Sequence, residues 1–384
     1  MTGPAATAHG APPLSLDDYA ALARRELPKD VWDFIAGGAG RERTLAANEA
    51  VFDTVSLRPK ALPGFTEPDT HVEVLGSRWA APLGVAPVAY HELAHGDGEI
   101  GTAGAAGALG LPLVVSTFAS QALERVARAA SAPLWLQLYC FRDEEVTRSL
   151  ARRAAATGYE ALVVTVDTPF MGRRLRDLRN GFQVPPHIVP ANLVDDLADG
   201  AQAGGAASPA AHSRTAFHPA LDWSVVARLH EWSGLPVIAK GVLSGADARA
   251  AMDAGVSGIV VSNHGGRQLD GAPATLEVLP EVVAAVEGRC PVLLDGGVRR
   301  GSDIVVALAL GATAVLVGRP VLHGLAVDGA AGAHAVLSLL MRELADTMAL
   351  TGRATVDAVD VSVLAPRAMH LRHLDLPYLP KEQR

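Results

Sequence analysis

Short apolar runs rich in β-branched residues recur along the chain from Pro82 onward, and Ala-rich amphipathic segments separate them. This alternation is expected of βα units whose strands form a parallel sheet. Eight such runs favour a closed barrel over an open sheet, so the pattern predicts an α/β fold of the TIM (β/α)8 type. The predicted strands are Leu83–Val85, Leu113–Val115, Leu134–Leu138, Ala161–Val166, Pro236–Ala239, Gly258–Val261, Val292–Leu294 and Ala314–Val317.

Helical patterns precede the barrel. Ser15–Glu26 is amphipathic and has Ser15 as its cap, and Lys29–Ala36 follows and ends at two glycines. We expect these helices to cover one barrel end. Residues 1–13 are rich in Ala, Pro and Gly and predict a flexible tail, which leaves residues 14–384 as a single barrel domain.

One long insertion, residues 181–219, interrupts the regular alternation after the fourth strand. Pro, Ala, Gly, Asp and Ser dominate it, and no helix or strand pattern persists. Insertions of this kind in barrels are usually lids or mobile loops, although the composition equally allows a solvated linker without a role.

Composition and charge narrow the function classes. The chain has 384 residues, of which 49% are hydrophobic and 19% charged, and its net charge is −8. An acidic chain without a basic stripe argues against nucleic acid or anionic lipid as the main partner. Cys140 and Cys290 cannot form a disulfide framework or a CxxC site, and the first residues lack a secretory signal. The apolar run at 305–317 is too short to span a bilayer, so we expect a cytoplasmic protein without membrane contact and without a metal site.

Polar residues follow most of the predicted strands, where the mouth of a barrel carries its chemistry. A single such residue is commonly a turn former, but a ring of them is harder to explain in that way. Asp167, Lys240 and His264 come directly after strongly apolar strands, where an unpaired charge is costly, so we predict a functional role for them. The other strand-end residues are Ala89, Tyr90, Ser116, Gln137, Tyr139, Thr165, Ser262, Asn263, Asp295, Gly318 and Arg319.

The last two βα loops predict a phosphate site. Asp295–Arg299 follows the seventh strand and Gly318–Pro320 follows the eighth. Barrels often hold a phosphate at these loops, because glycines let backbone N–H groups approach and arginine neutralises the charge. Turn formation alone accounts for the glycines but not for the arginines, so a phosphorylated cofactor is expected.

Together these motifs resemble the family of FMN-dependent α-hydroxy acid oxidases and dehydrogenases over nearly the whole chain. The most specific piece is Ser262–Asp270, with the sequence SNHGGRQLD. Supporting pieces are Gln137–Tyr139, Thr165–Pro169, Ala239–Gly241, Leu294–Arg299 and Val317–Pro320; Trp32–Gly38, Ala86–Tyr90 and Met171–Phe182 are most similar to members that oxidise 4-hydroxymandelate.

The resemblance implies FMN as the cofactor. Lys240 would lie at the pyrimidine edge of the flavin, where a positive charge stabilises the reduced ring. Small polar side chains would hydrogen-bond the ring, and the last two loops would hold the ribityl chain and the phosphate. The implied FMN contacts are Pro87, Val88, Ala89, Ser116, Gln137, Thr165, Lys240, Ser262, His264, Gly265, Arg267, Asp295, Gly296, Gly297, Arg299, Gly318 and Arg319.

The resemblance also implies the catalytic roles. His264 would be the general base, and Asp167 would orient its ring and stabilise the imidazolium. Arg267 and Arg174 would bind the substrate carboxylate, since guanidinium groups offer two-pronged donors. Tyr139 would hydrogen-bond the substrate hydroxyl, and Lys240 would complete the catalytic set. The α-hydrogen leaves either as a proton or as a hydride, and both routes use His264.

One position departs from the family pattern. Related enzymes place a carboxylate-binding tyrosine where this chain has Phe34, which makes an aromatic substrate more plausible than glycolate. Phe34, Phe118 and Met171 are candidates to contact the substrate ring. The implied reaction converts (S)-4-hydroxymandelate or a similar acid to the 2-oxo acid, and O2 becomes H2O2. Family members commonly form tetramers.

Three alternatives remain open, one of which is a flavin-binding protein without catalytic activity. A dehydrogenase of the same family would pass the electrons to a quinone or a protein, although 181–219 has no continuous apolar stretch for a membrane anchor. An FMN-binding isomerase or a non-redox phosphate-binding barrel would use Cys140 as a nucleophile, whereas a lone cysteine among apolar residues is more often inert packing.

Overall fold

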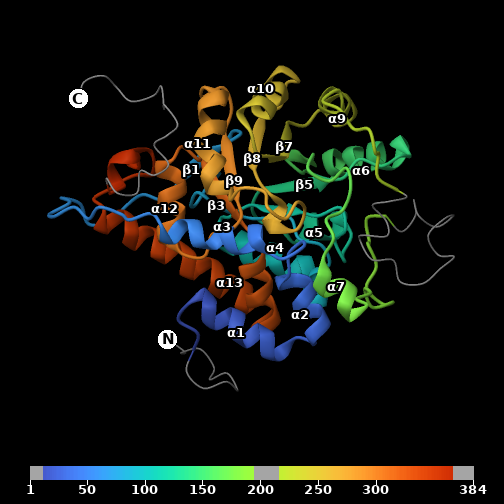
Figure 1. Cartoon of the computed structure of the whole chain (residues 1–384), viewed down its shortest axis with the longest axis horizontal. Helices are drawn as coiled ribbons and strands as arrows, with labels where there is room; N and C mark the ends of the chain where they lie inside the picture. The colour runs from blue at the N-terminus through green and yellow to red at the C-terminus, as the bar shows by residue number, and fades with distance from the viewer. Residues whose placement is uncertain (1–11, 194–215, 366–384) are drawn as a thin grey trace.

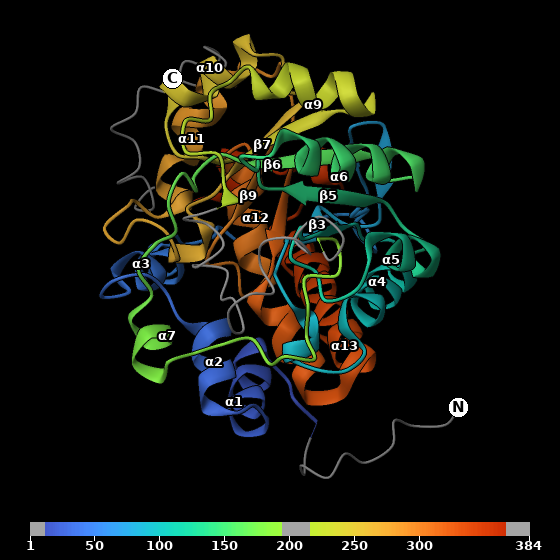
Figure 2. The same cartoon turned by 90° about the vertical axis from the view of Figure 1, so that its right-hand side faces the viewer.

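The barrel has eight parallel strands that close in the order β10-β3-β4-β5-β6-β7-β8-β9. In Figure 2 the paired strands β5, β6 and β7 lie side by side. The structure, a computed structural model, describes residues 12–193 and 216–365. The predicted TIM barrel is confirmed, and each predicted strand overlaps an observed one. The barrel strands are β3 (Leu83–Val85), β4 (Leu113–Val115), β5 (Leu134–Leu138), β6 (Ala161–Thr165), β7 (Val237–Val242), β8 (Gly258–Val261), β9 (Val292–Asp295) and β10 (Ala314–Val317).

Helices surround the strands, and two apolar layers hold the fold together (Figure 1). One layer lies between strands and helices, and the other fills the barrel interior with inward side chains such as Trp135, Ile238 and Leu293. The surrounding helices are α4 (Gly98–Ala108), α5 (Leu123–Ala129), α6 (Glu144–Ala156), α9 (Val225–Ser233), α10 (Gly245–Asp253), α11 (Thr275–Val286), α12 (Gly301–Ala309) and α13 (Arg319–Leu350); short 3-10 turns are η1 (His91–Leu93), η2 (His264–Gly266), η3 (Val356–Ala358) and η4 (Val361–Val363).

A hairpin closes the amino end of the barrel. Its strands, β1 (Val72–Val74) and β2 (Ser77–Trp79), pair antiparallel just before β3 begins. Trp79 is fully buried, and its ring lies 5.3 Å from the ring of Trp135 inside the barrel. The amino end is therefore packed with apolar side chains, and the carboxyl end is left for the site.

The N-terminal helices cover part of the carboxyl end, as the sequence predicted. They are α1 (Leu16–Glu26), α2 (Lys29–Ala36) and α3 (Arg43–Asp53). The Ser15 side chain accepts a hydrogen bond from the Asp18 backbone, which confirms it as the cap of α1. α1 packs against α13, α2 packs against α7 (Leu175–Asn180), and α3 packs against η2.

The first part of the insertion follows α7. α7 ends at Gly181, whose φ of 57° is left-handed, and residues 182–193 contain no helix or strand. Residues 194–215 of the predicted lid and residues 1–11 of the predicted tail lie outside the described part of the chain. The insertion returns to the barrel at Phe217, which forms an antiparallel bridge with Phe141.

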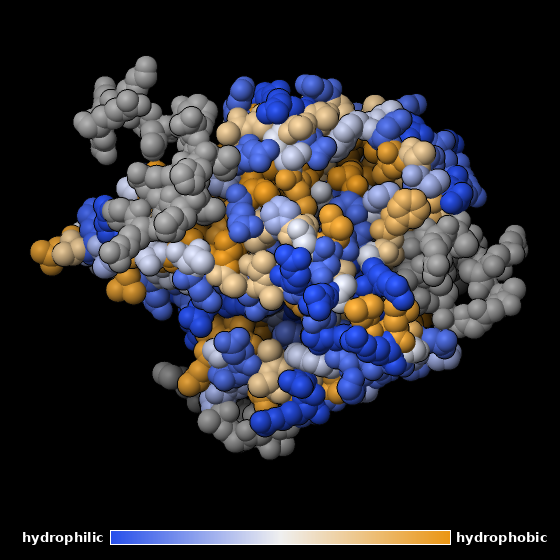
Figure 3. Space-filling model, viewed as in Figure 1, coloured by the Kyte–Doolittle hydropathy of each residue, from blue (hydrophilic) through white to orange (hydrophobic). Residues whose placement is uncertain are grey.

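Among the described residues, one helix, α13, has the length and apolar composition of a membrane span. In the structure, however, α13 packs against α1, α4 and α12, and its axis breaks at Asp328 and Gly329. On the face shown in Figure 3, hydrophilic and hydrophobic residues alternate without a continuous apolar belt. We therefore interpret α13 as a barrel helix.

Candidate active site

A cavity lies at the carboxyl ends of the barrel strands, where sequence reasoning expected the chemistry. Its walls come from all eight strand ends or the loops after them, and from α2 and the segment before α7. Asp167 and Ser262 lie just behind the wall, in contact with His264 and Lys240. Predicted residues that line the cavity are Phe34, Pro87, Val88, Ala89, Ser116, Phe118, Gln137, Tyr139, Thr165, Met171, Arg174, Lys240, His264, Gly265, Arg267, Asp295, Gly296, Gly297, Arg299, Gly318 and Arg319.

His264 is held between a carboxylate and a tyrosine. Its Nδ1 lies 3.2 Å from Asp167 Oδ1, and its Nε2 lies 3.5 Å from the Tyr139 hydroxyl. Burial lowers the pKa of His264 below its ordinary value, and the Asp167 carboxylate only partly opposes this. Burial alone would raise the pKa of Asp167, but His264 and Lys240 outweigh it and the pKa is lowered. The pair is therefore a neutral imidazole next to an ionised carboxylate near neutral pH.

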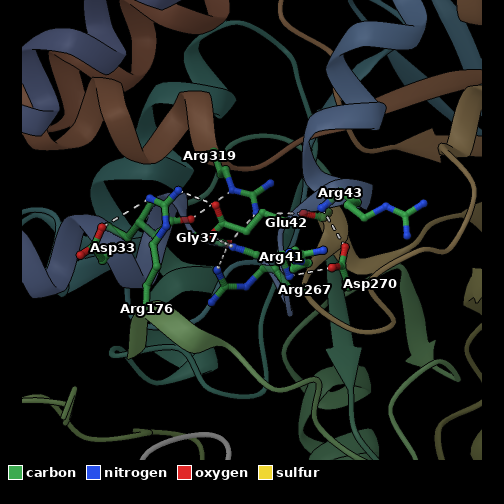
Figure 4. Close-up of polar contacts among 12 residues, drawn as sticks. Asp33, Gly37, Arg41, Glu42, Arg43, Arg176, Arg267, Asp270 and Arg319 are labelled. Atoms are coloured by element: carbon green, nitrogen blue, oxygen red, sulfur yellow. Dashed lines mark hydrogen bonds and ion pairs between the residues drawn. The ribbon is translucent and has the colours of Figure 1, made fainter. Parts of the chain in front are cut away.

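The loop that carries His264 is fastened to α3. Asn48 and Asn263 exchange side-chain amide hydrogen bonds of 2.8 and 2.7 Å, and Asp270 accepts from the backbone of Arg41 and Arg43 (Figure 4). Gly266 has a φ of 73°, and a Cβ there would lie 2.5 Å from the Leu45 backbone nitrogen. The conformation and the close approach both require glycine. The position of His264 therefore depends on the N-terminal segment.

Lys240 forms a buried ion pair across the barrel mouth. Its Nζ lies 3.1 Å from Asp295 Oδ2 and donates to Ser262 Oγ at 2.8 Å. The same hydroxyl accepts from the backbone N–H of His264 at 3.1 Å, so Ser262 links the lysine to the histidine loop. Asp295 Oδ1 is buried without a hydrogen-bond partner among the described residues. This oxygen is therefore an acceptor available to a ligand.

Three neighbouring strands supply a row of neutral polar groups. Ser116 Oγ donates to Gln137 Oε1 at 3.3 Å, and Gln137 Nε2 donates to Thr165 Oγ1 at 2.9 Å. All three side chains are buried and face the cavity. The row offers both donors and acceptors without charge, which suits the polar edge of a planar ring.

Two half-buried arginines converge on the end of α2 (Figure 4). Arg267 donates at 2.7 Å to the carbonyl oxygens of both Phe34 and Gly37. Arg319 donates to the carbonyl oxygens of Ile35, Gly37 and Gly265 at 2.9–3.1 Å. Burial lowers the pKa of both groups, that of Arg319 to about 10. Neither has a carboxylate ion pair among the described residues, so positive charge is concentrated here.

Arg174 differs from its neighbours. It lines the cavity, and its Nε is buried without a partner in the described part of the chain. Arg176 instead pairs with Asp33 and Glu42, while Arg173 and Arg179 are exposed. Of the arginines in this segment, Arg174 is therefore the one available to an anionic ligand.

The aromatic wall of the cavity contains Phe217, which sequence reasoning missed, and Phe182, also missed, packs behind Phe34 without lining the cavity. The Phe217 ring stacks on Tyr139, with ring centres 4.6 Å apart and planes 13° apart. Phe182 stacks on Phe34 at 4.5 Å. Both lie within the irregular insertion at 181–219, where no periodicity indicates which side chains point inward. Phe118 lies 5.6 Å from Tyr139 and completes the wall, with Met171 also lining the cavity.

Cys140 does not share this cavity. It lines a neighbouring one, and burial raises the pKa of its thiol to about 12. A thiol that stays protonated is a weak nucleophile. The geometry therefore gives no support to the alternative in which Cys140 attacks the substrate.

The residues of the main cavity fit FMN. The neutral row of Ser116, Gln137 and Thr165 suits the flavin ring, and Lys240 suits its pyrimidine edge. Asp295 Oδ1 would accept from a ribityl hydroxyl. The loop glycines and Arg299 would hold the phosphate, although Arg299 also pairs with Glu49 at 2.6 Å. The fold and donor set define a (β/α)8-barrel enzyme whose site lies at the carboxyl ends of the strands.

Comparison with known proteins gives the family. The FMN-dependent dehydrogenase family matches residues 23–366, so the chain belongs to this FMN-dependent enzyme family. It is 47% identical to 4-hydroxymandelate oxidase of Amycolatopsis orientalis over 90% of this chain and 96% of that protein. It is 46% identical to L-lactate oxidase of a Nostoc species over 92% and 98% of the two chains. The crystal structure of mandelate oxidase with (S)-4-hydroxymandelic acid superimposes with a TM-score of 0.86, at 46% identity, covering 92% of this chain and 98% of that one.

Proposed function

We propose that this protein is an FMN-dependent oxidase of aromatic 2-hydroxy acids, with (S)-4-hydroxymandelate and mandelate as its preferred substrates. One observation carries the proposal: the His264–Asp167 pair faces the same cavity as Arg174, Arg267 and Tyr139. A base, an anion clamp and a hydroxyl contact are the groups that oxidation of a 2-hydroxy acid needs. The similarity to 4-hydroxymandelate oxidase and mandelate oxidase supports the aromatic substrate.

His264 removes a proton from the substrate. Its Nδ1 faces Asp167 at 3.2 Å, so the proton is taken at Nε2. The Asp167 carboxylate then stabilises the imidazolium. The bound FMN supplies an acceptor for two electrons, which O2 finally receives to give H2O2. Nε2 of His264 accepts a proton whether the other hydrogen leaves as a hydride or as a proton.

The arginines bind and orient the substrate. The Arg174 guanidinium has no carboxylate partner among the described residues. Arg267 uses its Nη1 to bind carbonyls of the α2 end, and its other nitrogens can donate to the substrate carboxylate. Tyr139, 3.5 Å from His264, hydrogen-bonds the substrate hydroxyl. Phe34, Phe118 and Met171 pack against the aromatic ring.

Anaerobic reduction of the bound flavin tests the proposal directly. S- and R-mandelate, 4-hydroxymandelate, lactate and glycolate are mixed with the protein, and loss of the flavin absorbance is followed. We expect the S aromatic acids to bleach the flavin fastest. A higher catalytic efficiency on lactate than on the mandelates would overturn the substrate assignment, and no bleaching by any hydroxy acid would overturn the activity.

The electron acceptor needs its own measurement. The oxidase names of the similar proteins favour O2 over a quinone or protein acceptor. We expect one H2O2 for each 2-oxo acid formed in air. Turnover only with artificial acceptors would instead identify a dehydrogenase.

The assembly and the compartment are also part of the proposal. We infer a cytoplasmic homotetramer, from the family resemblance and from an acidic chain with two cysteines. Light scattering on the purified holoenzyme measures the mass, and a monomer at micromolar concentration would contradict the tetramer.

A further inference from the structure

A second cavity lies next to the main one, behind the aromatic wall. The two cavities share Tyr139, Thr165 and Phe217 as lining residues. We call the second one the side cavity; its other lining residues are Cys140, Val166, Thr168, Pro169, His218, Leu221, Asp222, Trp223, Gly241, Val242 and Asp247. The stacked rings of Tyr139 and Phe217 therefore lie between two spaces.

Phe217 is a fixed partition because its backbone is held on both sides. Arg142 N–H donates to the Ala216 carbonyl at 2.7 Å, and His218 N–H donates to the Cys140 carbonyl at 2.9 Å. The Phe217 side chain is only 3% exposed and also contacts Phe141 edge-on at 5.6 Å. Since these hydrogen bonds use only backbone atoms, a smaller side chain at 217 leaves them intact.

The chemistry of the two cavities differs. The main cavity contains Arg174 and Arg267, whereas no lysine or arginine lines the side cavity among the described residues. The side cavity instead mixes apolar side chains with Thr168, His218 and the exposed carboxylates of Asp222 and Asp247. A substrate carboxylate belongs with the arginines, and a neutral group suits the side cavity better than an anion does.

We propose that Phe217 sets the upper size limit of the group attached to the substrate's α-carbon, and that the side cavity is a subsite for a neutral group which this ring keeps closed. The inference rests on the proposed function, because the carboxylate must bind at the arginines for the ring to point toward the partition. Removing the Phe217 ring joins the two spaces. The enlarged site then accepts hydroxy acids with a longer apolar substituent.

The test compares mandelate with 4-phenylmandelate in the wild-type holoenzyme and in the Phe217→Ala variant. A methylene-sized misfit in a hydrophobic pocket changes kcat/KM by about 10- to 200-fold, so we expect Phe217→Ala to raise kcat/KM for 4-phenylmandelate at least about tenfold. For mandelate we expect a fall of about two- to tenfold, because Tyr139 loses one aromatic partner. The ratio of the two efficiencies is the diagnostic quantity.

Equilibrium binding gives a second readout that does not depend on turnover. The 2-oxo acids that correspond to the two substrates are titrated calorimetrically into the air-oxidised holoenzyme. We expect the Kd of the larger oxo acid to be lower for Phe217→Ala than for the wild-type protein. Phe217→Leu, which keeps most of the bulk, should resemble the wild type and provides a variant with little risk of misfolding.

Two matched variants locate the effect. Phe141→Ala removes a buried ring of the same aromatic cluster that lines neither cavity, and it should leave the substrate ratio unchanged. Leu221→Trp, added to Phe217→Ala, refills the side cavity from its far wall and should reverse the gain. An unchanged ratio in a folded, flavin-loaded Phe217→Ala variant overturns the inference. If wild-type protein oxidises no 2-hydroxy acid, the proposed function fails instead.

Discussion

The Asp167→Asn variant tests the electrostatic role of the carboxylate next to His264. Asparagine keeps the size of the side chain and an oxygen that can accept a hydrogen bond, but it removes the charge. The Asp167 carboxylate raises the pKa of His264 against the lowering effect of burial. Without it, the pKa of His264 should fall further below its ordinary value, and the imidazolium formed during the reaction should lose its counter-charge.

The structure sets the size of the effect. Two opposite charges about 4 Å apart attract by about 4 kcal/mol at an effective dielectric constant of about 20. The contact of 3.2 Å between Nδ1 and Oδ1 is buried, so solvent screens it little. Because the asparagine oxygen retains part of the hydrogen bond, we take a loss of about 3 kcal/mol in the transition state. This corresponds to a decrease of about 10²-fold in kcat.

The pH dependence gives the sign of the effect. Only neutral His264 accepts the proton, so kcat/KM falls as pH drops through the pKa of His264, which lies below 6.5 in the free enzyme. In Asp167→Asn the acidic limb should move to lower pH while the plateau falls. Steady-state kinetics between pH 4.5 and 8 measure both, and the flavin spectrum confirms that cofactor is retained. A limb that stays in place or moves to higher pH, with kcat within about threefold of the wild type, would refute the reasoning.

Three further predictions concern the same cavity. His264→Asn should lower kcat by about 10²–10⁴-fold with FMN still bound, measured by anaerobic stopped-flow reduction; near-normal turnover would contradict the base assignment. Arg174→Lys should raise KM without lowering Tm. Arg267→Lys should raise KM and also lower Tm, because Arg267 donates to two carbonyls of the α2 end. Equal Tm values for the two variants would count against this distinction. Lys240→Met should destabilise the protein by about 3–5 kcal/mol in urea unfolding, because Asp295 keeps a buried uncompensated charge; an unchanged unfolding midpoint would show that the pair is not buried in solution.

Much of the site could be predicted from sequence because, in a closed parallel barrel, the order of the strands along the chain determines where the end of each strand lies. Strand ends such as those at Gln137, Lys240 and Asp295 must meet at one mouth once the strands form a closed parallel barrel. The apolar runs identify the strands, so residues just after them are assigned to the cavity without any knowledge of long-range contacts. Most of the polar strand-end residues line the cavity, whereas Tyr90 and Asn263 do not, and the roles assigned to them stay predictions.

The same reasoning cannot place residues that reach the cavity from outside the repeat. Phe217 lies at the end of an insertion without periodicity, and its position depends on a bridge to Phe141. Arg319 shows a related limit of sequence-based prediction. The sequence predicts it as a phosphate ligand, but its guanidinium also donates to three backbone carbonyls. A sequence motif predicts that a residue lies near the cavity, but not which of its donors the fold already uses.

The distribution of charge in the cavity connects folding to ligand binding. Arg174, Arg267 and Arg319 all line the cavity, and their partial burial lowers the pKa of each of them. Neutral carbonyls of the α2 end meet part of the hydrogen bonding of Arg267 and Arg319, which leaves the positive charges without full compensation. A substrate carboxylate and a cofactor phosphate are the groups that would complete this balance. The stability of the N-terminal segment and the affinity for anions are therefore properties of the same cluster, so a substitution that weakens one should weaken the other.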